Sequence, residues 1–314
     1  ISTFEQSNTS NCSISSAFYM DKYNALYLYN ICCEAQFSHS RYNHCSRINK
    51  INAPNQYRPL DKTTIFVEKF TGRMLEKTLG IVLHIIPYND KISVAHLYTE
   101  QYGRSSYLIP QGGGKKARMF RSLFMPFSIL ELDIDYRNSR ELQKIIEART
   151  VLPLQNIYSD PVKNAEALFL SEVLCQTIKE PEPNLPLFAF IARSIQVLNI
   201  MEEGKANFHL CFLLQLCSFF GFSPNMETYL PGYFFDMLNG VFSPSRPIHT
   251  YTLDAREAEI FARLTRMDFN NLRHFKFNRG ERNAILDRIL TYYRLHQPDI
   301  SELRSPEILR AIFD

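Results

Sequence analysis

TLGIVLHII, residues 78–86, is a β-branched and apolar run that ends at the turn cluster Pro87–Asp90. A run of this kind, bounded by turn residues, is typical of a buried β-strand. The next run, Ile92–Tyr98, alternates apolar with small or polar residues, as a half-buried strand does. Together the two runs predict a β-hairpin at the start of a β-rich domain.

Three further strands are predicted downstream of this hairpin. Gly103 marks the next turn, and Ser105–Ile109 follows as the third strand. The fourth spans Phe127–Tyr136, and Leu142–Ala148 is the fifth, although its Glu and Lys content also suits a helix. Five short strands with two hairpins first favour a small Greek-key barrel of the OB type, with an SH3-like barrel as the alternative.

A glycine-rich basic segment, Pro110–Arg121 (PQGGGKKARMFR), is expected to form the loop between the third and fourth strands. Its three glycines allow positive φ or a close approach to a ligand, and the basic side chains can meet several phosphates. Aromatic rings nearby offer faces on which bases stack. The alternative is a flexible, solvated hairpin loop without a partner. The basic residues are Lys115, Lys116, Arg118 and Arg121, and the aromatic residues are Tyr102, Tyr107 and Phe120.

The same segment is not a nucleotide-binding P-loop. That motif requires glycine at position 109 and Ser or Thr at position 116, where this chain has Ile109 and Lys116. The sequence also contains no His-Glu-x-x-His and no Gly-x-Ser-x-Gly motif. We therefore expect a protein that is not an enzyme and that needs neither a cofactor nor a metal.

Residues 151–314 are expected to form an all-helical domain. Asp160 is a suitable N-cap, and Pro161 then opens a run with helical spacing that extends to Ile178. Residues 225–252 are rich in Pro and Gly and are expected to be irregular. Further helices are predicted at 187–201, 207–220, 254–267, 279–296 and 305–313.

Residues 1–73 differ from the rest, because residues 1–71 contain no glycine and follow no sustained period. Our hypothesis is that Met74 is the physiological start and that an upstream start assignment added the preceding residues. The alternative is a disordered, lineage-specific extension, and a native mass that includes residues 1–73 would contradict the first hypothesis. The predicted organisation is an extension (1–73), an OB-fold DNA-binding domain (74–150) and a helical domain (151–314).

Composition favours a soluble protein in the cytoplasm. Hydrophobic content is 45%, charged content is 21%, and the chain has no apolar run long enough to span a membrane. Cys175, Cys211 and Cys217 lie in apolar helical runs, which indicates buried thiols in a reducing compartment. The net charge is only +3, so any basic footprint for nucleic acid is local. The earlier cysteines, Cys12, Cys32, Cys33 and Cys45, have no zinc-like spacing.

Segments spread along the chain from Met74 onward match one family in order and spacing. They are Gly80–Leu83, Tyr88–Asp90, Leu97–Arg104, Gly112–Arg121, Leu123–Ser128, Ala206–Phe208, Phe219–Pro224, Arg282–Asn283 and Tyr292–His296. With its glycine-basic segment followed by Pro-Phe, the chain resembles the RecO family of bacterial recombination mediators.

This resemblance implies a mediator of DNA repair and homologous recombination. Members of the family bind single- and double-stranded DNA, anneal complementary strands, assemble with RecR, engage the single-stranded-DNA-binding protein SSB and help load RecA. Two alternatives stay open, a protein-interaction scaffold that does not bind DNA and an OB-fold RNA binder. Carried over by position, the DNA contacts fall on Arg104, Lys115, Lys116, Arg118 and Arg121.

One feature of the family is missing from this sequence. Many members carry a four-cysteine zinc site in the place of Asn225–Thr252, a span that contains no cysteine here. We therefore expect no zinc, and we expect Tyr233–Phe235 to pack this span together with Leu238 and Val241.

Overall fold

The computed structural model describes residues 75–312, apart from the side chain of Lys116. The hypothesis about Met74 and the interpretation of the cysteines before residue 50 lie outside the described residues.

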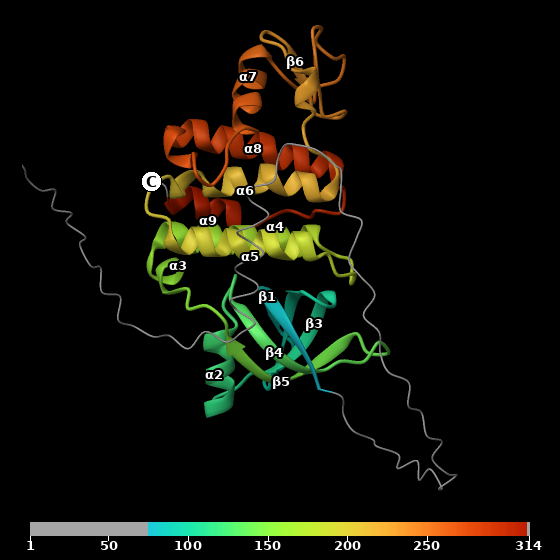
Figure 1. Cartoon of the computed structure of the whole chain (residues 1–314), viewed down its shortest axis with the longest axis vertical. Helices are drawn as coiled ribbons and strands as arrows, with labels where there is room; N and C mark the ends of the chain where they lie inside the picture. The colour runs from blue at the N-terminus through green and yellow to red at the C-terminus, as the bar shows by residue number, and fades with distance from the viewer. Residues whose placement is uncertain (1–74, 313–314) are drawn as a thin grey trace, which may run out of the picture. The chain divides into compact units, whose positions relative to one another are not determined.

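The first part of the described chain is a closed five-stranded barrel of the OB type, as predicted (Figure 1). The strand order is β1-β2-β3-β5-β4, and pairing between β1 and β4 closes the barrel. Every neighbouring pair is antiparallel except β3 with β5. The strands are β1 (Glu76–Pro87), β2 (Ile92–Thr99), β3 (Gly103–Pro110), β4 (Ile129–Asp135) and β5 (Leu142–Thr150).

Apolar side chains, which alternate with polar ones along the strands, fill the interior of the barrel. On β4, Leu130, Leu132 and Ile134 are fully buried in the barrel core, while Glu131 and Asp133 between them are partly exposed. The fifth predicted segment forms a strand and not a helix, because it pairs with β4 on one side and with β3 on the other.

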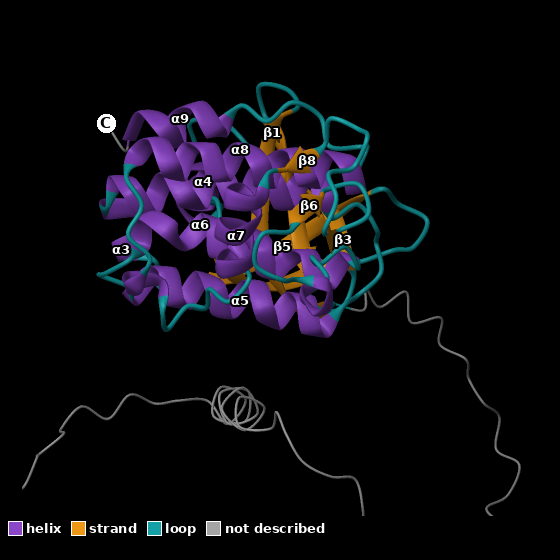
Figure 2. Cartoon of the chain, turned by 90° about the horizontal axis from the view of Figure 1, so that it is seen from above, coloured by secondary structure: helices purple, strands orange, loops and turns teal. Residues whose placement is uncertain are grey.

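Helices make up most of the remaining chain, and the long ones run side by side in both views (Figures 1 and 2). Asp160 Oδ1 accepts from the Val162 and Lys163 amides, which confirms the predicted cap of α4. The helices are α3 (Gln155–Ser159), α4 (Pro161–Thr177), α5 (Leu185–Ile200), α6 (Phe208–Leu216), α7 (Ala255–Leu264), α8 (Arg279–His296) and α9 (Ser305–Ile312). Short 3-10 turns lie at Lys205–Asn207, Cys217–Phe220, Met226–Thr228 and Leu272–His274.

The expectation that residues 225–252 are irregular was wrong. This stretch contributes two strands and part of a third to a small sheet of order β7-β6-β8. Its strands have only two or three residues each, which is too short to show a period of two in the sequence. They are β6 (Phe234–Asp236), β7 (Val241–Ser243) and β8 (Thr252–Leu253).

Part of the barrel packs into the hydrophobic core of the helices, while the interior of the barrel forms a core of its own. Tyr98 and Phe127 from the barrel belong to the same cluster of buried side chains as α4, α5 and α6. The Tyr98 hydroxyl donates to the Asn184 carbonyl over 3.2 Å, and the Phe127 ring lies 6.5 Å from the Phe212 ring. Gly103, with φ of 54°, approaches this region so closely that a Cβ atom would lie 2.3 Å from the Glu182 carbonyl oxygen, and only glycine fits there.

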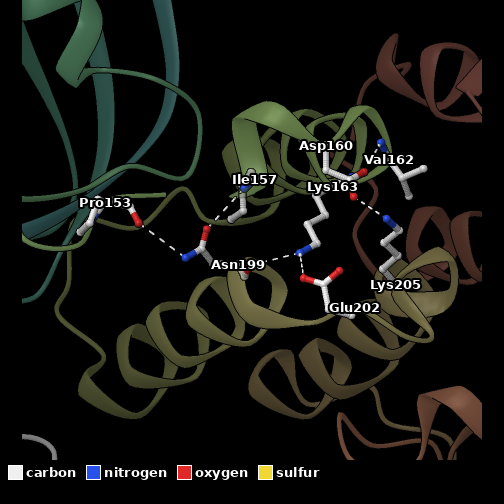
Figure 3. Close-up of polar contacts among 8 residues, drawn as sticks. All are labelled: Pro153, Ile157, Asp160, Val162, Lys163, Asn199, Glu202 and Lys205. Atoms are coloured by element: carbon white, nitrogen blue, oxygen red, sulfur yellow. Dashed lines mark hydrogen bonds and ion pairs between the residues drawn. The ribbon is translucent and has the colours of Figure 1, made fainter. Parts of the chain in front are cut away.

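A polar network fixes the link between β5 and the helices (Figure 3). The Asn199 amide, at the end of α5, accepts from the Ile157 N–H at 3.3 Å and donates to the Pro153 carbonyl at 3.5 Å. Lys163 is only 1% exposed, and its ammonium donates to the Asn199 carbonyl over 3.1 Å. The buried charge is thus held at the carbonyl end of a helix, where a cation is favoured.

Candidate nucleic-acid interface

The second half of the glycine-basic segment is a helix, α2 (Lys115–Leu123), and not a loop. Ala117, Phe120 and Phe124 are buried at helical spacing, and the two phenylalanine rings stack 5.6 Å apart within the barrel core. Burial of this apolar stripe explains why the sequence folds locally as a helix at one end of the barrel (Figure 1).

Basic side chains occupy the opposite, exposed face of α2. Lys115, Arg118 and Arg121 are all exposed. Arg118 Nε donates to the Gly113 carbonyl at 3.2 Å, and an Arg121 terminal nitrogen donates to the Gly112 carbonyl at 3.1 Å. Both guanidinium groups are therefore folded back over the glycine turn that precedes the helix. Lys116 lies in the same first turn of α2.

The N-terminus of α2 adds to this positive potential. Its N-cap is Gly114, which has no side chain to accept from the first amides of the helix. Those amides and the helix dipole favour an anion, and a Cβ atom placed on Gly113 or Gly114 would meet nothing within 4 Å. The turn is therefore open to a ligand on the side where the basic side chains gather.

Two of the three aromatic residues predicted to stack with bases are buried. Tyr107 is 0% exposed and Phe120 is 2% exposed, so neither ring can receive a base in this structure. Tyr102 is partly buried, and its ring stacks on Tyr136 with the centroids 3.9 Å apart. Helical spacing with Ala117 and Phe124 was the signal in the sequence that places Phe120 in the core.

Arg104 lies away from the basic face of α2, at the contact between β3 and the C-terminal end of α4. Its guanidinium donates to the Cys175 carbonyl at 2.5 Å and to the Ile178 carbonyl at 2.8 Å. These carbonyls end the helix and have no partner within it, so the side chain acts as a C-terminal cap. The prediction of a DNA contact at Arg104 thus falls on a residue with a structural role.

A cavity of about 700 Å³ lies beside Arg104, between the barrel and α4. It was not anticipated from the sequence, because its walls come from residues distant along the chain. His96 Nδ1 lies 2.8 Å from the Ser106 hydroxyl in one wall. Burial, and then the Arg104 charge, lower the pKa of His96 to about 4, so this imidazole is neutral near pH 7.

The small sheet β7-β6-β8 occupies the place where the resemblance implied a zinc site. Phe235 is fully buried, with its ring 4.7 Å from Phe242 and 4.9 Å from Phe261. The expected packing is confirmed for Phe235, but Leu238 is 40% exposed, and Phe242 fills the position beside Phe235. Within the described part of the chain, no three His, Cys, Asp or Glu side chains gather as metal ligands.

The thiols behave largely as expected. Cys211 and Cys217 are buried, and Cys175 is partly buried. Burial raises the pKa of Cys217 to about 12, so the thiol stays protonated and unreactive. Among residues 75–312, no helix has the length and apolar character needed to cross a bilayer.

Comparisons with known proteins agree on one family. The family model described as recombination protein O N terminal matches residues 74–154, and the one described as recombination protein O C terminal matches residues 158–301. The DNA repair protein RecO of Bacteroides fragilis is 42% identical over 242 residues, which cover 77% of this chain and 100% of the relative. The DNA repair protein RecO of Azobacteroides pseudotrichonymphae is 40% identical over 241 residues, with the same coverage, and that of Porphyromonas gingivalis is 37% identical over 246 residues. The chain therefore belongs to the RecO family of DNA repair proteins.

Proposed function

We propose that the protein is a DNA repair and homologous recombination mediator that binds single- and double-stranded DNA and anneals complementary strands. The observation that carries this proposal is the exposed basic face of α2, with Lys115, Arg118 and Arg121 beside an open glycine turn. Such side chains neutralise phosphates and release counterions, which supplies most of the affinity for DNA of any sequence. Lys116, in the first turn of the same helix, belongs to the proposed interface.

Annealing follows from the same neutralisation of charge. Two complementary strands repel one another through their phosphates, and a basic surface that binds them lowers this repulsion. Watson–Crick pairing then supplies the driving force and the sequence specificity. The step forms and breaks no covalent bond, so we propose no catalytic residue and no cofactor for it.

We exclude Arg104, Tyr107 and Phe120 from the proposed interface, because their side chains are used inside the protein. Base stacking at Tyr102 stays a prediction, since the residue is only partly buried and stacks on Tyr136. We further propose that the protein acts with RecR, and that it helps load RecA onto DNA coated with SSB. Family membership supports these partners, and we assign no residues to them.

Titration of labelled single-stranded DNA at several salt concentrations tests the proposed interface. Arg118→Ala removes one exposed charge from α2, and it is expected to lower the slope of log affinity against log salt by roughly 0.7. Arg149→Ala is the matched control, because Arg149 is also exposed but pairs with Glu147 at 3.0 Å and with Glu131 at 3.9 Å. Equal slopes for Arg118→Ala and the wild-type protein would exclude α2 as the interface.

Strand annealing is followed in parallel with the same proteins, and RNA of equal sequence serves as a competitor. Salt-sensitive binding with accelerated annealing supports the mediator function. Preference for RNA would favour the RNA-binding alternative. Absence of both binding and annealing at low salt would favour a protein-interaction scaffold.

A further inference from the structure

The positive charge of the helical part of the chain is concentrated in one segment. Residues 263–282 contain six Arg or Lys residues and two acidic residues, whereas residues 150–314 as a whole contain 16 basic and 19 acidic residues. Within this segment Arg273 and Lys276 are exposed, just before α8 begins. The segment is therefore basic within a region that is acidic overall.

The backbone that carries these exposed cations is held by a close approach to Gly204 and by a hydrogen bond from Asn207. Arg273, His274 and Lys276 line a shallow cavity of about 550 Å³ together with Gly204 and one acidic residue, Glu203. Gly204 has φ of 75°, and a Cβ atom there would lie 2.8 Å from the Arg273 backbone nitrogen, so only glycine permits this approach. Beneath the cavity, the Asn207 amide donates to the Phe275 carbonyl over 2.7 Å.

In the part of the chain that the structure describes, acidic side chains near the segment make no close ion pair with Arg273. Asp268 and Glu281 accept hydrogen bonds from backbone amides of their own turns. Glu203 reaches Arg273 only at 4.0 Å, and both side chains are more than half exposed, so the pair is weak. Arg282, in contrast, points inward to the Asn207 side chain and the Phe277 carbonyl, and we do not count it as part of the surface.

A chain of contacts connects this cavity to the end of the barrel that carries α2. Pro126, just after α2, accepts a hydrogen bond from the Tyr158 hydroxyl of α3 at 3.1 Å. Asp160, two residues further on, pairs with Lys205, which is next to Gly204 in the cavity wall (Figure 3). The two basic surfaces are thus linked through α3 and the turn after α5.

We infer that the Arg273–Lys276 segment is a second phosphate-binding surface, which holds the second nucleic-acid strand while α2 holds the first. This inference rests on the proposed function and extends it, because annealing requires two strands to be held by one protein. The cationic groups here are exposed and line a shallow cavity. That arrangement suits a phosphate backbone, which is bound through several weak contacts, better than a small anion.

The test compares two double variants that each remove two exposed charges from the helical part. One is Arg273→Ala with Lys276→Ala, and the control is Arg246→Ala with Arg294→Ala, which are exposed elsewhere on the same part of the chain. Each full-length protein is first saturated with one strand, and annealing of the complementary strand is then measured. Loss of two phosphate contacts is expected to slow annealing on the order of tenfold, with affinity for the first strand unchanged within about twofold.

Each other outcome overturns the inference in a recognisable way. Equal annealing by the two double variants means that the segment holds no strand. Loss of first-strand affinity together with annealing means that the segment extends the α2 site and does not hold a second strand. In a parallel titration with labelled polyglutamate, loss of its binding with annealing unchanged means that the surface serves an acidic protein. In these cases wild-type binding and its dependence on Arg118 would persist, whereas failure of the proposed function would remove them in every protein tested.

Discussion

Glu166 and His209 form a buried pair between α4 and α6. Their side chains are at most 1% exposed, and Glu166 Oε1 lies 2.9 Å from His209 Nδ1. Burial raises the pKa of Glu166 well above its ordinary value of 4.5. Burial, and then the charge of Arg282, lower the pKa of His209 to about 3. Both shifts favour the neutral forms of the two groups, a protonated carboxyl at Glu166 and an uncharged imidazole at His209.

The shifted pKa values of Glu166 and His209 make the free energy of unfolding depend on pH. In the unfolded chain, with ordinary pKa values of 4.5 and 6.5, the two groups hold one proton between these pH values. Below pH 4.5 the unfolded chain binds a second proton, so stability falls as pH falls toward 3. The raised pKa of Glu166 acts in the opposite direction, because above pH 4.5 the unfolded carboxyl loses its proton while the folded one keeps it. This contribution to stability therefore falls as pH rises toward the folded pKa of Glu166. Each limb has a slope of about 1.4 kcal/mol per pH unit.

Replacing Glu166 with Gln tests this account on the alkaline limb. Glutamine can still donate to His209 Nδ1, but it has no proton to lose, so the variant is expected to keep more of its stability between pH 6.5 and pH 8. The measurement is the free energy of unfolding in urea at these pH values. Parallel pH profiles for the variant and the wild-type protein would show that Glu166 is ionised in the folded state.

At the scale of elements, the sequence predicts best those helices and strands whose periods are long and uninterrupted. The predicted bounds of α8 agree with the structure, because Asn278 and Glu281 form a capping box at its start and the apolar stripe runs to His296. Residues 110–121 were predicted as a loop because three glycines and adjacent lysines dominate the local composition. The burial of Phe120 inside the barrel, a tertiary effect, decides in favour of the helix.

Side-chain roles were harder to predict than elements, because partners come from distant parts of the chain. Arg104 follows a glycine turn and has the sequence character of an exposed DNA contact. The carbonyls that it caps are 71 and 74 residues away, so no local pattern indicates them. The cluster of basic side chains on α2 was predictable, because Arg118 and Arg121 are close neighbours in sequence, although the helix that carries them was not.

The capping box of α8 provides a prediction at this scale. Asn278 Oδ1 accepts from the Glu281 N–H at 2.9 Å, so Asn278→Ala leaves an amide of the first turn without its partner. The expected loss in the free energy of unfolding is about 1 kcal/mol. Asn138→Ala, at an exposed position outside any helix, is the control and is expected to change stability by less than about 0.5 kcal/mol. Equal losses in both variants would indicate that the box does not stabilise α8.

At the scale of the whole molecule, the barrel and the helices are expected to unfold together. Phe127 illustrates the coupling, since it has φ of 67°, a conformation that is rare for a bulky residue. Its ring packs into the core shared with the helices, and its N–H donates to the Val82 carbonyl at 2.9 Å. Contacts to both sides hold the residue in this conformation, so neither part keeps its native geometry when the other is lost.

Two fluorescent probes and one substitution test this coupling. The chain contains no tryptophan, so Tyr136→Trp places a probe in the barrel part and Phe220→Trp places one in the helical part. Both probes are expected to give the same urea midpoint.

Arg104→Gln removes the charged donor between β3 and α4, and it should lower the stability seen by both probes by about 1.5–3 kcal/mol. Because Arg104 caps α4, the same substitution should leave the salt dependence of DNA binding unchanged. A shift seen by the barrel probe alone would mean that the barrel unfolds independently, and a reduced salt slope would mean that Arg104 contacts phosphate after all.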